Sequence, residues 1–526
     1  MKILTAAQMQ GIDRATTERY GVPSLTLMEN AGRSVVQFLQ ERFSPLEKQE
    51  IVILCGRGNN GGDGLVVARM LRELGLQPRV LLLALPERLK GDAEVNYKRL
   101  AKTGAALSAP DHASWEKFKG EMGNASLVID AILGTGLSEP LGGFLLEVVR
   151  DTPRVFPKAR IVAVDLPTGV AADSGELIGE CVQADASVTF TAPKVAHVFP
   201  PACEKAGEWV VSPIGTPAEA FEGRPDLFLN ILQPHDLEWL VRPRKLESHK
   251  GTFGHVLVLG GSVGKTGAAA MAAKAALRAG AGLATVATPG SALPVIASLS
   301  MEIMTEPLPE TGSGTISLRA IEDGVLDRLV ENKSVVAVGP GLGREPETMD
   351  LVRRFVSRCD LPVVLDADGL NAFDGCIKTL QAEGRIRVLT PHPGEMGRLA
   401  GQKTSEIVAH RLEVAREFAR RHGVQLVLKG FRTLTASPDG QVWVNPTGNP
   451  GMATGGSGDV LTGITAGLLA QYPDRLATEV VAAAVYLHGL AGDIAARELG
   501  EASVIAGDIL DALPKAYQEL KRQLHI

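Results

Sequence analysis

Short apolar runs alternate with segments of helical periodicity along most of the chain. The runs predict strands at 51–55, 79–84, 127–131, 160–165 and 187–191, and further along at 255–260, 283–288, 334–339, 361–366, 386–390 and 424–429. Apolar residues spaced by three and four predict helices at 6–20, 26–39, 65–74, 268–279 and 460–470. This alternation is typical of a mainly parallel sheet with helices on both faces, so we expect an α/β fold.

The chain is long enough for more than one domain. A single hydrophobic core rarely serves 526 residues, so two or three domains are expected. The segment 211–225 is rich in Pro and Gly and has no periodicity, and it separates the two series of strands. We therefore predict domains at 1–225 and 226–526.

Composition and charge exclude several classes of partner. The net charge is −6 and no block of Lys or Arg is present, which argues against binding to nucleic acid or to an acidic membrane surface. No apolar run has the length of a membrane span, and the N-terminus lacks the pattern of a signal peptide. The five cysteines are scattered, without a Cys-x-x-Cys pair. We expect free thiols in a cytoplasmic protein.

A glycine-rich stretch with one carboxylate, 451–463, follows the last predicted strand. Four glycines precede Asp459, and the predicted helix 460–470 follows it. Glycine loops allow close approach of the backbone to a phosphate, and the free N–H groups of a helix start attract anions. A carboxylate beside a phosphate is useful when it takes a proton from an attacking hydroxyl. The alternative is an ordinary turn in which Asp459 caps the helix.

A second glycine loop, 261–266, superficially resembles a P-loop. The Walker motif requires a glycine at position 259, where this chain has Leu259. We therefore interpret Thr266 as the start of an Ala-rich helix rather than as a nucleotide ligand.

Polar loops also follow the strands of the first half. The strand 51–55 leads into the glycine loop 56–64, and Asp63, Asp130 and Asp165 all fall at strand ends. Ligands of open parallel sheets bind at this edge. Three converging acids with few nearby Lys or Arg residues require a cation or a protonated group, and Asn and Asp oxygens suit a hard cation.

The motifs 58–64, 130–136 and 165–169 resemble the NAD(P)H-hydrate epimerase family, which interconverts the R and S epimers of hydrated NADH or NADPH. The resemblance covers nearly all of residues 1–215 and implies a Rossmann-like three-layer domain. It implies a potassium ion held by Asn60, Asp130 and Thr168, and Asp165 as the candidate acid/base. It also implies substrate contacts from Asn59, Asn60, Gly61, Gly62, Asp63, Gly134, Thr135, Gly136, Leu137, Ser138, Glu139, Pro140 and Asp165. The alternative is a nucleotide-binding regulatory module without turnover.

The loops of the second half, 339–343, 366–371, 392–396, 429–433 and 455–461, resemble the ribokinase-like superfamily and, within it, the ADP- or ATP-dependent NAD(P)H-hydrate dehydratases. The match covers about residues 230–520. It implies that Gly341, His392 and Asp459 contact the hydrated substrate. It implies nucleotide contacts from Lys429, Gly430, Phe431, Arg432, Thr433 and Gly458. By analogy with related kinases, Glu395 would order a magnesium ion.

The implied chemistry is repair of a damaged cofactor. Asp459 would deprotonate the ring hydroxyl as it attacks the terminal phosphate of ADP, and phosphate would then leave to restore NADH or NADPH. The resemblance favours ADP over ATP and a homo-oligomer, with dehydration of the S form and epimerisation supplying it. His392 is expected as a substrate contact rather than a base, and Lys429 as a nucleotide ligand rather than a solvent residue. The alternative is a vitamin or sugar kinase with the same Asp459 base.

Overall fold

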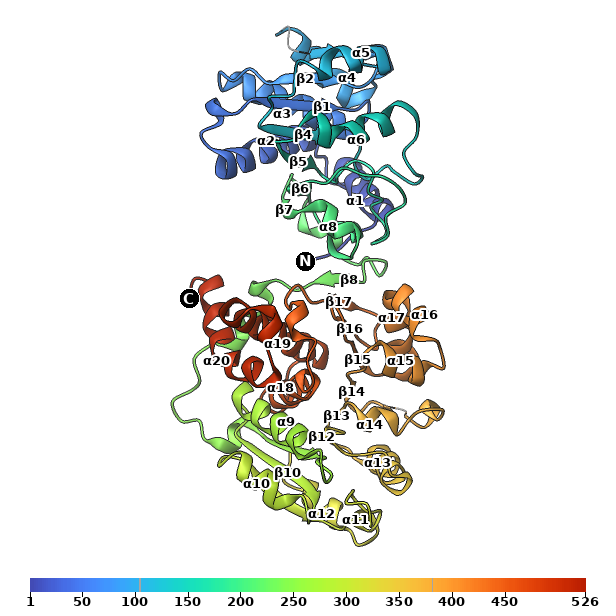
Figure 1. Ribbon diagram of the computed structural model, residues 1–526, viewed down its shortest axis with the longest axis vertical. Helices are drawn as coiled ribbons and strands as arrows, with labels where there is room; N and C mark the ends of the chain where they lie inside the picture. Colours follow the sequence, from blue (N-terminus) through green and yellow to red (C-terminus); the bar gives the residue numbers. More distant parts are fainter. Residues whose placement is uncertain (104–105, 381) are drawn as a thin grey trace. The chain divides into compact units, whose positions relative to one another are not determined.

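The computed structural model describes residues 1–103, 106–380 and 382–526. It divides into two compact units, Lys2–Leu227 and Phe228–Ile526, the second of which also contains Met1. The chain passes from one unit to the other two residues after the predicted boundary at 225. Both units are α/β folds, as the apolar pattern predicts (Figure 1).

The N-terminal unit contains a seven-stranded parallel sheet in the order β3-β2-β1-β4-β5-β6-β7. Its strands are β1 (Ile51–Cys55), β2 (Arg79–Leu82), β3 (Ala106–Ser108), β4 (Leu127–Ala131), β5 (Arg160–Val164), β6 (Ala186–Phe190) and β7 (Glu208–Ser212). The order reverses between β1 and β4, so the loops after these strands diverge. Such a switch point opens a crevice at the carboxyl ends of the strands.

Helices cover both faces of this sheet. The helices are α1 (Ala6–Glu18), α2 (Ser24–Phe43), α3 (Asn59–Glu73), α4 (Gly91–Ala101), α5 (His112–Lys119), α6 (Gly143–Val155), α7 (Val195–Val198) and α8 (Ala202–Ala206). Ile53 of β1 packs into a cluster with α2, α3 and α4, whereas the next residue, Leu54, packs with α5 and α6. Because neighbouring strand residues point to opposite faces, one fully apolar strand supplies both cores.

The C-terminal unit contains a ten-stranded sheet in the order β11-β10-β9-β12-β13-β14-β15-β16-β17-β8. Its strands are β8 (Leu229–Ile231), β9 (His255–Leu259), β10 (Leu283–Pro289), β11 (Met304–Leu308), β12 (Val335–Val338), β13 (Val363–Leu365), β14 (Arg387–Leu389), β15 (Gln425–Leu428), β16 (Leu434–Ala436) and β17 (Val442–Val444). The pairs from β11 to β15 are parallel, and β15-β16 and β16-β17 are antiparallel. The sheet is thus mainly parallel, as expected.

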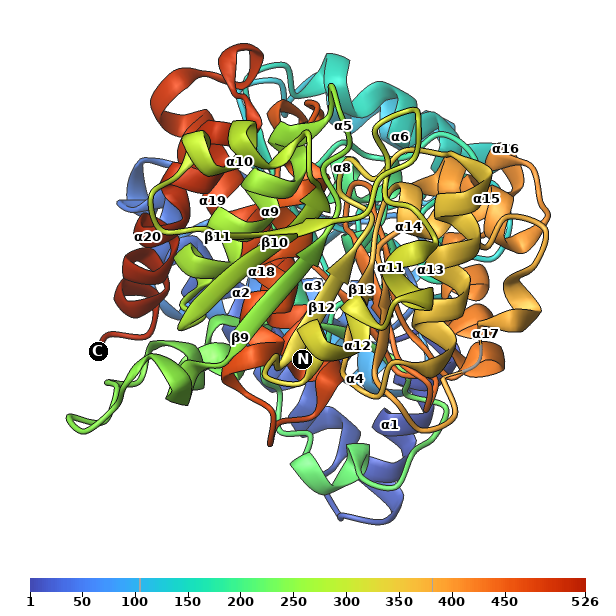
Figure 2. The same ribbon diagram turned by 90° about the horizontal axis from the view of Figure 1, so that it is seen from below.

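The helices of this unit form two layers. They are α9 (Thr266–Ala279), α10 (Leu293–Leu299), α11 (Arg319–Glu322), α12 (Val325–Val330), α13 (Pro346–Arg358), α14 (Asp368–Asn371), α15 (Pro393–Ala400), α16 (Thr404–Ala409), α17 (Arg411–His422), α18 (Ser457–Gln471), α19 (Ala477–Leu499) and α20 (Ala506–Gln523). Figures 1 and 2 show α9, α18, α19 and α20 on one face of the sheet and α13–α17 on the other. This arrangement brings the N-terminus of α18 to the carboxyl ends of the strands.

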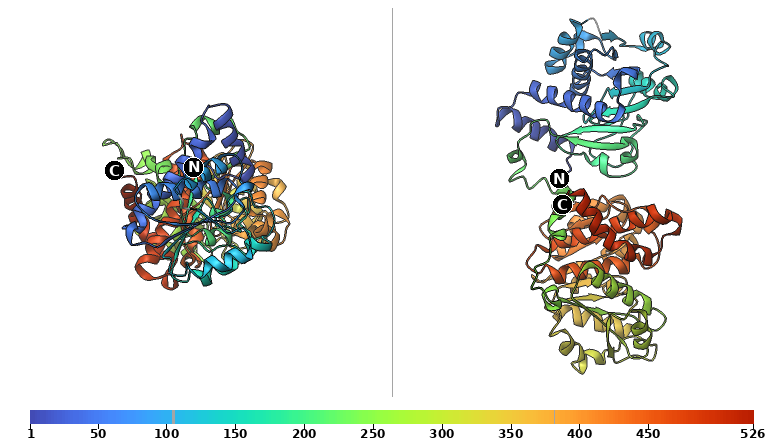
Figure 3. Two further views of the ribbon diagram at one scale, coloured as in Figure 1. Left: turned by 90° about the horizontal axis from the view of Figure 1, so that it is seen from above. Right: turned by 90° about the vertical axis from the view of Figure 1, so that its left-hand side faces the viewer.

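Helix α19 alone, among the described residues, has the length and composition of a membrane span. The apolar pattern did not single it out as one, and 83% of its most apolar window is buried. Figure 3 shows α19 and α20 together among the red helices of the C-terminal unit, and the two helices pack against each other. The hydropathy of α19 is therefore that of a core helix.

Two parts of the fold differ from the expected elements. Helix α3 starts at Asn59, six residues before the predicted start, so much of the glycine loop is helical. A Cβ on Gly61 would lie 1.9 Å from the Gly56 carbonyl oxygen, and one on Gly64 would lie 2.6 Å from Ala131 Cβ. The glycines thus let the helix begin directly against the strands. The pattern also missed β3, β7, β8, β11, β16 and β17, which are short or lie toward the sheet edges.

Candidate active sites

The N-terminus of α18 forms an open anion site in the C-terminal unit. Gly456 is the N-cap residue with φ +94°, and no side chain caps the helix. A Cβ at this position would lie 2.7 Å from Met271 Cε in addition to the backbone strain, so only glycine suits it. The first N–H groups of α18 thus remain available to an anion. Asp459 is the third helical residue, so the simple reading of it as the cap does not hold.

Asp459 stands in a group of charged side chains from neighbouring strand ends. Burial, with a further contribution from the Asp366 carboxylate, raises the pKa of Asp459 to about 7 against the opposing effect of Lys429. Asp366 Oδ1 accepts hydrogen bonds from Lys429 Nζ at 3.0 Å and Thr390 Oγ1 at 2.8 Å, and its Oδ2 accepts from Thr462 Oγ1 at 2.9 Å. A carboxyl with a pKa near neutrality is well matched to general-base work.

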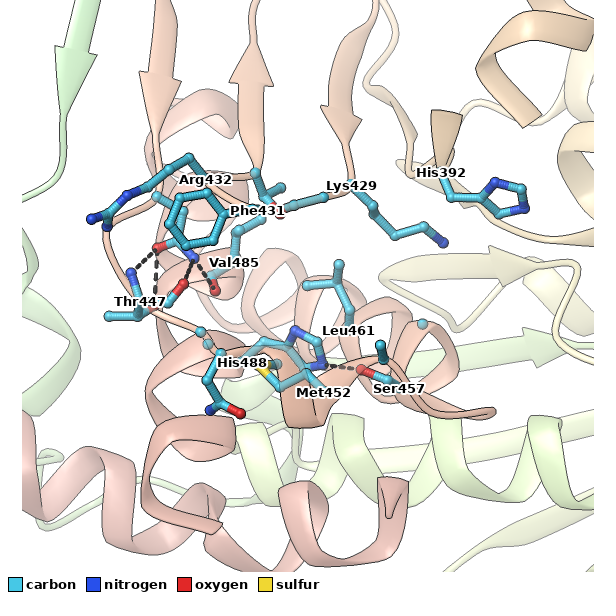
Figure 4. A pocket seen from close by; sticks show the side chains of 18 of the residues that line it. His392, Lys429, Phe431, Arg432, Thr447, Met452, Ser457, Leu461, Val485 and His488 are labelled. Carbon is cyan, nitrogen blue, oxygen red and sulfur yellow. Dashed lines mark hydrogen bonds between the residues drawn. The ribbon is translucent and has the colours of Figure 1, made fainter. Parts of the chain in front are cut away.

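A cavity of 610 Å³ lies next to this group and contains every residue predicted to bind the nucleotide: Lys429, Gly430, Phe431, Arg432, Thr433 and Gly458. Figure 4 shows Lys429 and His392 toward one end and Phe431, Arg432 and Thr447 toward the other, with His488 and Leu461 between them. Asp459 and Gly341 are not among its lining residues. The cavity therefore groups the predicted nucleotide ligands, and of the predicted substrate contacts its lining includes His392 but not Asp459 or Gly341.

The side chains of His392 and Glu395 hold each other at the start of α15. His392 Nδ1 accepts the Gly394 N–H at 3.0 Å, and Glu395 Oε2 accepts the His392 N–H at 2.9 Å. Burial lowers the pKa of His392, with Lys429 adding to this effect and Glu395 opposing it. His392 Nδ1 is thus engaged in capping and Nε2 lies 3.5 Å from Glu395 Oε1, while the ring lines the cavity, so its contact with substrate stays a prediction. Lys429 is no solvent residue, because it is tied to Asp366.

Glu395 does not belong to a chelating cluster. Among the described residues, the one group of three side chains with metal-ligand spacing is His112, Glu116 and Glu147, far from these loops in the sequence and unrelated to them. Glu395 offers one carboxylate, and magnesium commonly binds to one or two carboxylates together with substrate phosphates, so its role stays a prediction.

Gly341 is a packing position in the loop after β12. Its φ is +64°, and a Cβ would lie 2.2 Å from the Lys265 carbonyl oxygen. Its own carbonyl accepts hydrogen bonds from Ser262 N at 2.7 Å and Ser262 Oγ at 2.8 Å. Gly341 therefore fixes the loop, and its contact with substrate stays a prediction.

The N-terminal unit has its own cavity of 510 Å³ at the switch point between β1 and β4. Seven of the predicted residues line it: Asn59, Asn60, Asp63, Gly134, Thr135, Gly136 and Asp165. Gly61 and Gly62 do not, because their Cα atoms pack against Gly56 and Met28. Leu137, Ser138, Glu139 and Pro140 lie outside the lining as well, and the last three are exposed.

Asp165 and Lys194 form a buried ion pair in this cavity. Lys194 Nζ lies 2.5 Å from Asp165 Oδ1, which also accepts from Thr189 Oγ1 at 2.8 Å. Burial acts to raise the pKa of Asp165, but the Lys194 ammonium outweighs it and holds the pKa below its usual value. His197 Nδ1 accepts the Lys194 N–H at 3.0 Å, so its Nε2 donates to the Asp165 carbonyl at 2.9 Å. Asp165 itself has φ +65°, a strained conformation typical of functional positions.

The three residues expected to bind potassium fall into two groups. Thr168 Oγ1 donates to Asp130 Oδ1 at 2.6 Å, and both side chains are fully buried. Asn60 is also buried, and neither its Oδ1 nor its Nδ2 has a hydrogen-bond partner among the described residues. Burial raises the pKa of Asp130 to about 6 despite hydrogen bonds from Thr168. A buried amide oxygen without a partner is a group that a bound cation would satisfy, and its place beside Asp130 and Thr168 stays a prediction.

Sequence reasoning missed Lys194, Asp366 and Asp13. Asp366 could have been noticed, because it ends a predicted strand and begins a loop that the pattern singles out. Lys194 had no such signal, since it comes four residues after β6 in an irregular segment. Asp13 lines the N-terminal cavity from α1. In the sequence it is indistinguishable from an ordinary acid on the surface of a helix.

Comparison with known proteins covers both units. The family model described as NAD(P)H-hydrate dehydratase matches residues 256–515, and the model described as YjeF-related protein N-terminus matches residues 24–196. The chain is 44% identical to the bifunctional NAD(P)H-hydrate repair enzyme of Moorella thermoacetica, covering 100% of this chain and 98% of that protein. The corresponding enzyme of Thermofilum pendens is 39% identical over 99% and 97% of the two chains.

Among solved structures, the ADP/ATP-dependent NAD(P)H-hydrate dehydratase of Bacillus subtilis, crystallised with ATP and Mg²⁺, is 32% identical, with a TM-score of 0.47 over 55% of this chain and 98% of that one. The full-length relatives settle the kinship, because identity at this level spans both units and the segment between them. The chain belongs to the family of bifunctional NAD(P)H-hydrate repair enzymes.

Proposed function

We propose that the N-terminal unit epimerises hydrated NADH and NADPH and that the C-terminal unit dehydrates the S form with ADP, giving NAD(P)H, AMP and phosphate. The observation that carries this proposal is the Asp459 carboxyl at the open N-terminus of α18, beside Lys429 and a cavity of 610 Å³. Joined on one chain, the two activities would recover both epimers of the damaged cofactor.

In the dehydratase reaction, hydroxide is a poor leaving group and must first be activated. The Asp459 carboxylate would accept the proton of the ring hydroxyl as its oxygen attacks the terminal phosphate of ADP. Lys429 and the N–H groups of Ser457 and Gly458 would stabilise the charge on the transferring phosphoryl group. Phosphate would then leave with the lone pair of the ring nitrogen assisting. Glu395 would help to hold magnesium together with the nucleotide phosphates, and the ion would supply charge neutralisation when bound.

In the epimerisation, the stereocentre bears a hydroxyl next to the ring nitrogen. Asp165 would exchange protons with this group, and Lys194 would keep Asp165 ionised and oriented toward the cavity. Asn60, with Asp130 and Thr168, would hold potassium, whose positive charge would offset the buried carboxylates.

A racemic mixture of hydrated NADPH with ADP tests the whole proposal. Full recovery of the absorbance of reduced nicotinamide is the expected result with the intact chain. Recovery that stops once one epimer has been consumed would show dehydratase activity without epimerase activity. A stable phosphorylated organic product, with no free phosphate, would instead identify a kinase.

The glycine at position 458 leads to a prediction about nucleotide binding. A Cβ there would lie 3.2 Å from Lys429 Nζ and 3.5 Å from Asp366 Oδ2, in the space expected for a phosphate. We expect Gly458→Ala to raise the KM for ADP roughly tenfold, which corresponds to about 1.4 kcal/mol. Gly267→Ala is the matched control, because Gly267 is also the second residue of a helix and a Cβ there meets nothing within 4 Å. Equal effects of the two substitutions on KM would contradict this placement of the phosphate.

The unpartnered amide of Asn60 leads to a second prediction. Replacing a buried unsatisfied polar group with an isosteric apolar one normally stabilises a protein, by about 1–3 kcal/mol. We expect Asn60→Leu to raise the thermal unfolding temperature in potassium-free buffer and to abolish both the stabilisation and the faster epimerisation that KCl gives the wild type. Choline chloride at equal ionic strength is the control. If KCl stabilises the variant as much as the wild type, Asn60 is not a ligand.

A further inference from the structure

The N-terminal cavity contains a carboxyl group that the mechanism above does not use. Asp13, on α1, lines the cavity together with Asp165 and Lys194. Its Oδ1 is buried and has no hydrogen-bond partner in the described part of the chain. A buried carboxylate without a partner is costly, whereas a neutral carboxylic acid in the same place is tolerated and carries a proton that it can donate.

The one buried ammonium of the cavity is already committed to other groups. Lys194 Nζ has three acceptors, Asp165 Oδ1 at 2.5 Å, Thr189 Oγ1 at 2.8 Å and the Phe190 carbonyl at 3.3 Å. An ammonium has three N–H donors, so none remains for Asp13. Asp165 and Asp13 therefore differ, because Asp165 is bonded to a cation and Asp13 is not.

The other charged groups around the cavity do not remove this difference. Asp63 from α3, Asp92 from α4 and Arg14 from α1 also line it. Burial raises the pKa of Asp13 to about 6, with Asp165 adding to the shift and Lys194 opposing it. Burial likewise raises the pKa of Asp63 well above its usual value. Two carboxyls whose environments move their pKa values apart are suited to act as an acid and a base.

We propose that Asp13 is a second catalytic residue of the epimerisation, donating a proton where Asp165 accepts one. This inference rests on the proposed epimerase function. The Asp13 carboxyl gives its proton to the hydroxyl on the ring carbon, and the C–O bond breaks as water leaves and the ring-nitrogen lone pair forms a C=N bond. A water then adds to the opposite face, the electron pair returns to nitrogen, and the proton of that water goes to the Asp165 carboxylate.

Each inversion moves one proton from the Asp13 carboxyl to the Asp165 carboxylate. One water leaves, one water enters, and one proton passes from Asp13 to Asp165, so no oxidant or co-reactant is needed. The enzyme is then left with Asp13 ionised and Asp165 protonated, the form that catalyses the reverse inversion. Exchange with solvent restores the starting form.

The test uses the full chain with the purified R hydrate and chiral separation of the epimers, after subtraction of the rate without enzyme. We expect Asp13→Asn to lower kcat for epimerisation by roughly 100-fold or more, with KM within threefold, since it removes a general acid. Glu18→Gln, an exposed acid on the same helix, is the control and should match the wild type. Asp13→Glu, which keeps a carboxyl, should recover part of the rate if Asp13→Asn folds poorly.

Two further measurements separate a catalytic from a structural role. Because the acid must be protonated, wild-type kcat/KM should fall as pH rises through about 6, and Asp13→Asn should lack this fall. In ¹⁸O-water each inversion should introduce one ¹⁸O atom, and inversion that retains the original oxygen would overturn the step. An Asp13→Asn rate within threefold of the wild type, with the same fall, would overturn the role of Asp13. A wild-type chain that does not accelerate inversion would overturn the epimerase function itself.

Discussion

Substitution of Asp459 by Asn abolishes dehydration of the S hydrate while epimerisation continues at nearly the wild-type rate. We expect this result because the amide has the shape of the carboxylate but cannot accept the hydroxyl proton. Loss of a positioned base lowers a rate by roughly 100- to 10,000-fold. Asp459 and Asp165 belong to separate compact units with separate cavities, so the second activity has no physical reason to change.

The measurement follows reduced nicotinamide from the S hydrate with ADP, and in parallel the R/S ratio without ADP. The dissociation constant for ADP should stay unchanged, which shows that the site is folded. Asp474→Asn is a matched control, because Asp474 is exposed just beyond the end of α18. Simultaneous loss of both activities would refute the assignment of one activity to each unit.

The same residue predicts the pH profile of dehydration. A general base is active when ionised, and burial raises the pKa of Asp459 to about 7. The wild-type kcat/KM should therefore rise with pH up to about 7 and level off above it. The residual kcat/KM of Asp459→Asn should not rise with pH over this range. A wild-type profile that is flat between pH 5 and 9 would exclude a titrating base at this position.

The sequence predicts the interior of both sheets well, for a clear physical reason. Strands such as β1 are buried on both faces and wholly apolar, so the run stands out, and the equally buried β4 departs from this pattern only at Asp130. The missed strands lack this signal: most of the edge strand β11 is exposed, and β16 and β17, near the opposite edge, have only three residues each. The start of α3 was hidden because glycine has poor helix propensity, and only the close approach of Gly61 to Gly56 explains its use.

The candidate sites were predictable to the extent that they follow strand ends or helix starts. Asp459, Asp165 and the residues 429–433 sit where a parallel sheet collects its ligands, and their positions could be anticipated from order alone. Lys194 and Asp13 could not, because their roles depend on how an irregular segment and α1 pack over the sheet. Burial and ion pairs between residues far apart in the sequence produce no periodic pattern of apolar and polar positions.

The second large effect is expected at Asp165. Asp165→Asn should reduce epimerisation by roughly 100-fold or more, since an amide neither accepts a proton nor neutralises Lys194. With racemic hydrate and ADP, recovery of reduced nicotinamide should slow sharply after the S form is consumed, while the initial rate stays that of the wild type. Because removing one partner of a buried ion pair costs about 3–5 kcal/mol, the KM for the R hydrate must be measured to show that the cavity still forms.

Lys194→Met changes the ionisation of Asp165 while leaving the Asp165 side chain in place. Lys194 holds the pKa of Asp165 below its usual value against the opposing effect of burial. Without the ammonium, the main effect that opposes burial is lost, so the pKa of Asp165 should rise and the carboxylate needed as base should form only at higher pH. The acid limb of epimerisation should therefore move to higher pH, with activity returning as pH increases. A variant whose activity falls equally at every pH would show that Lys194 positions substrate rather than controlling the ionisation of Asp165.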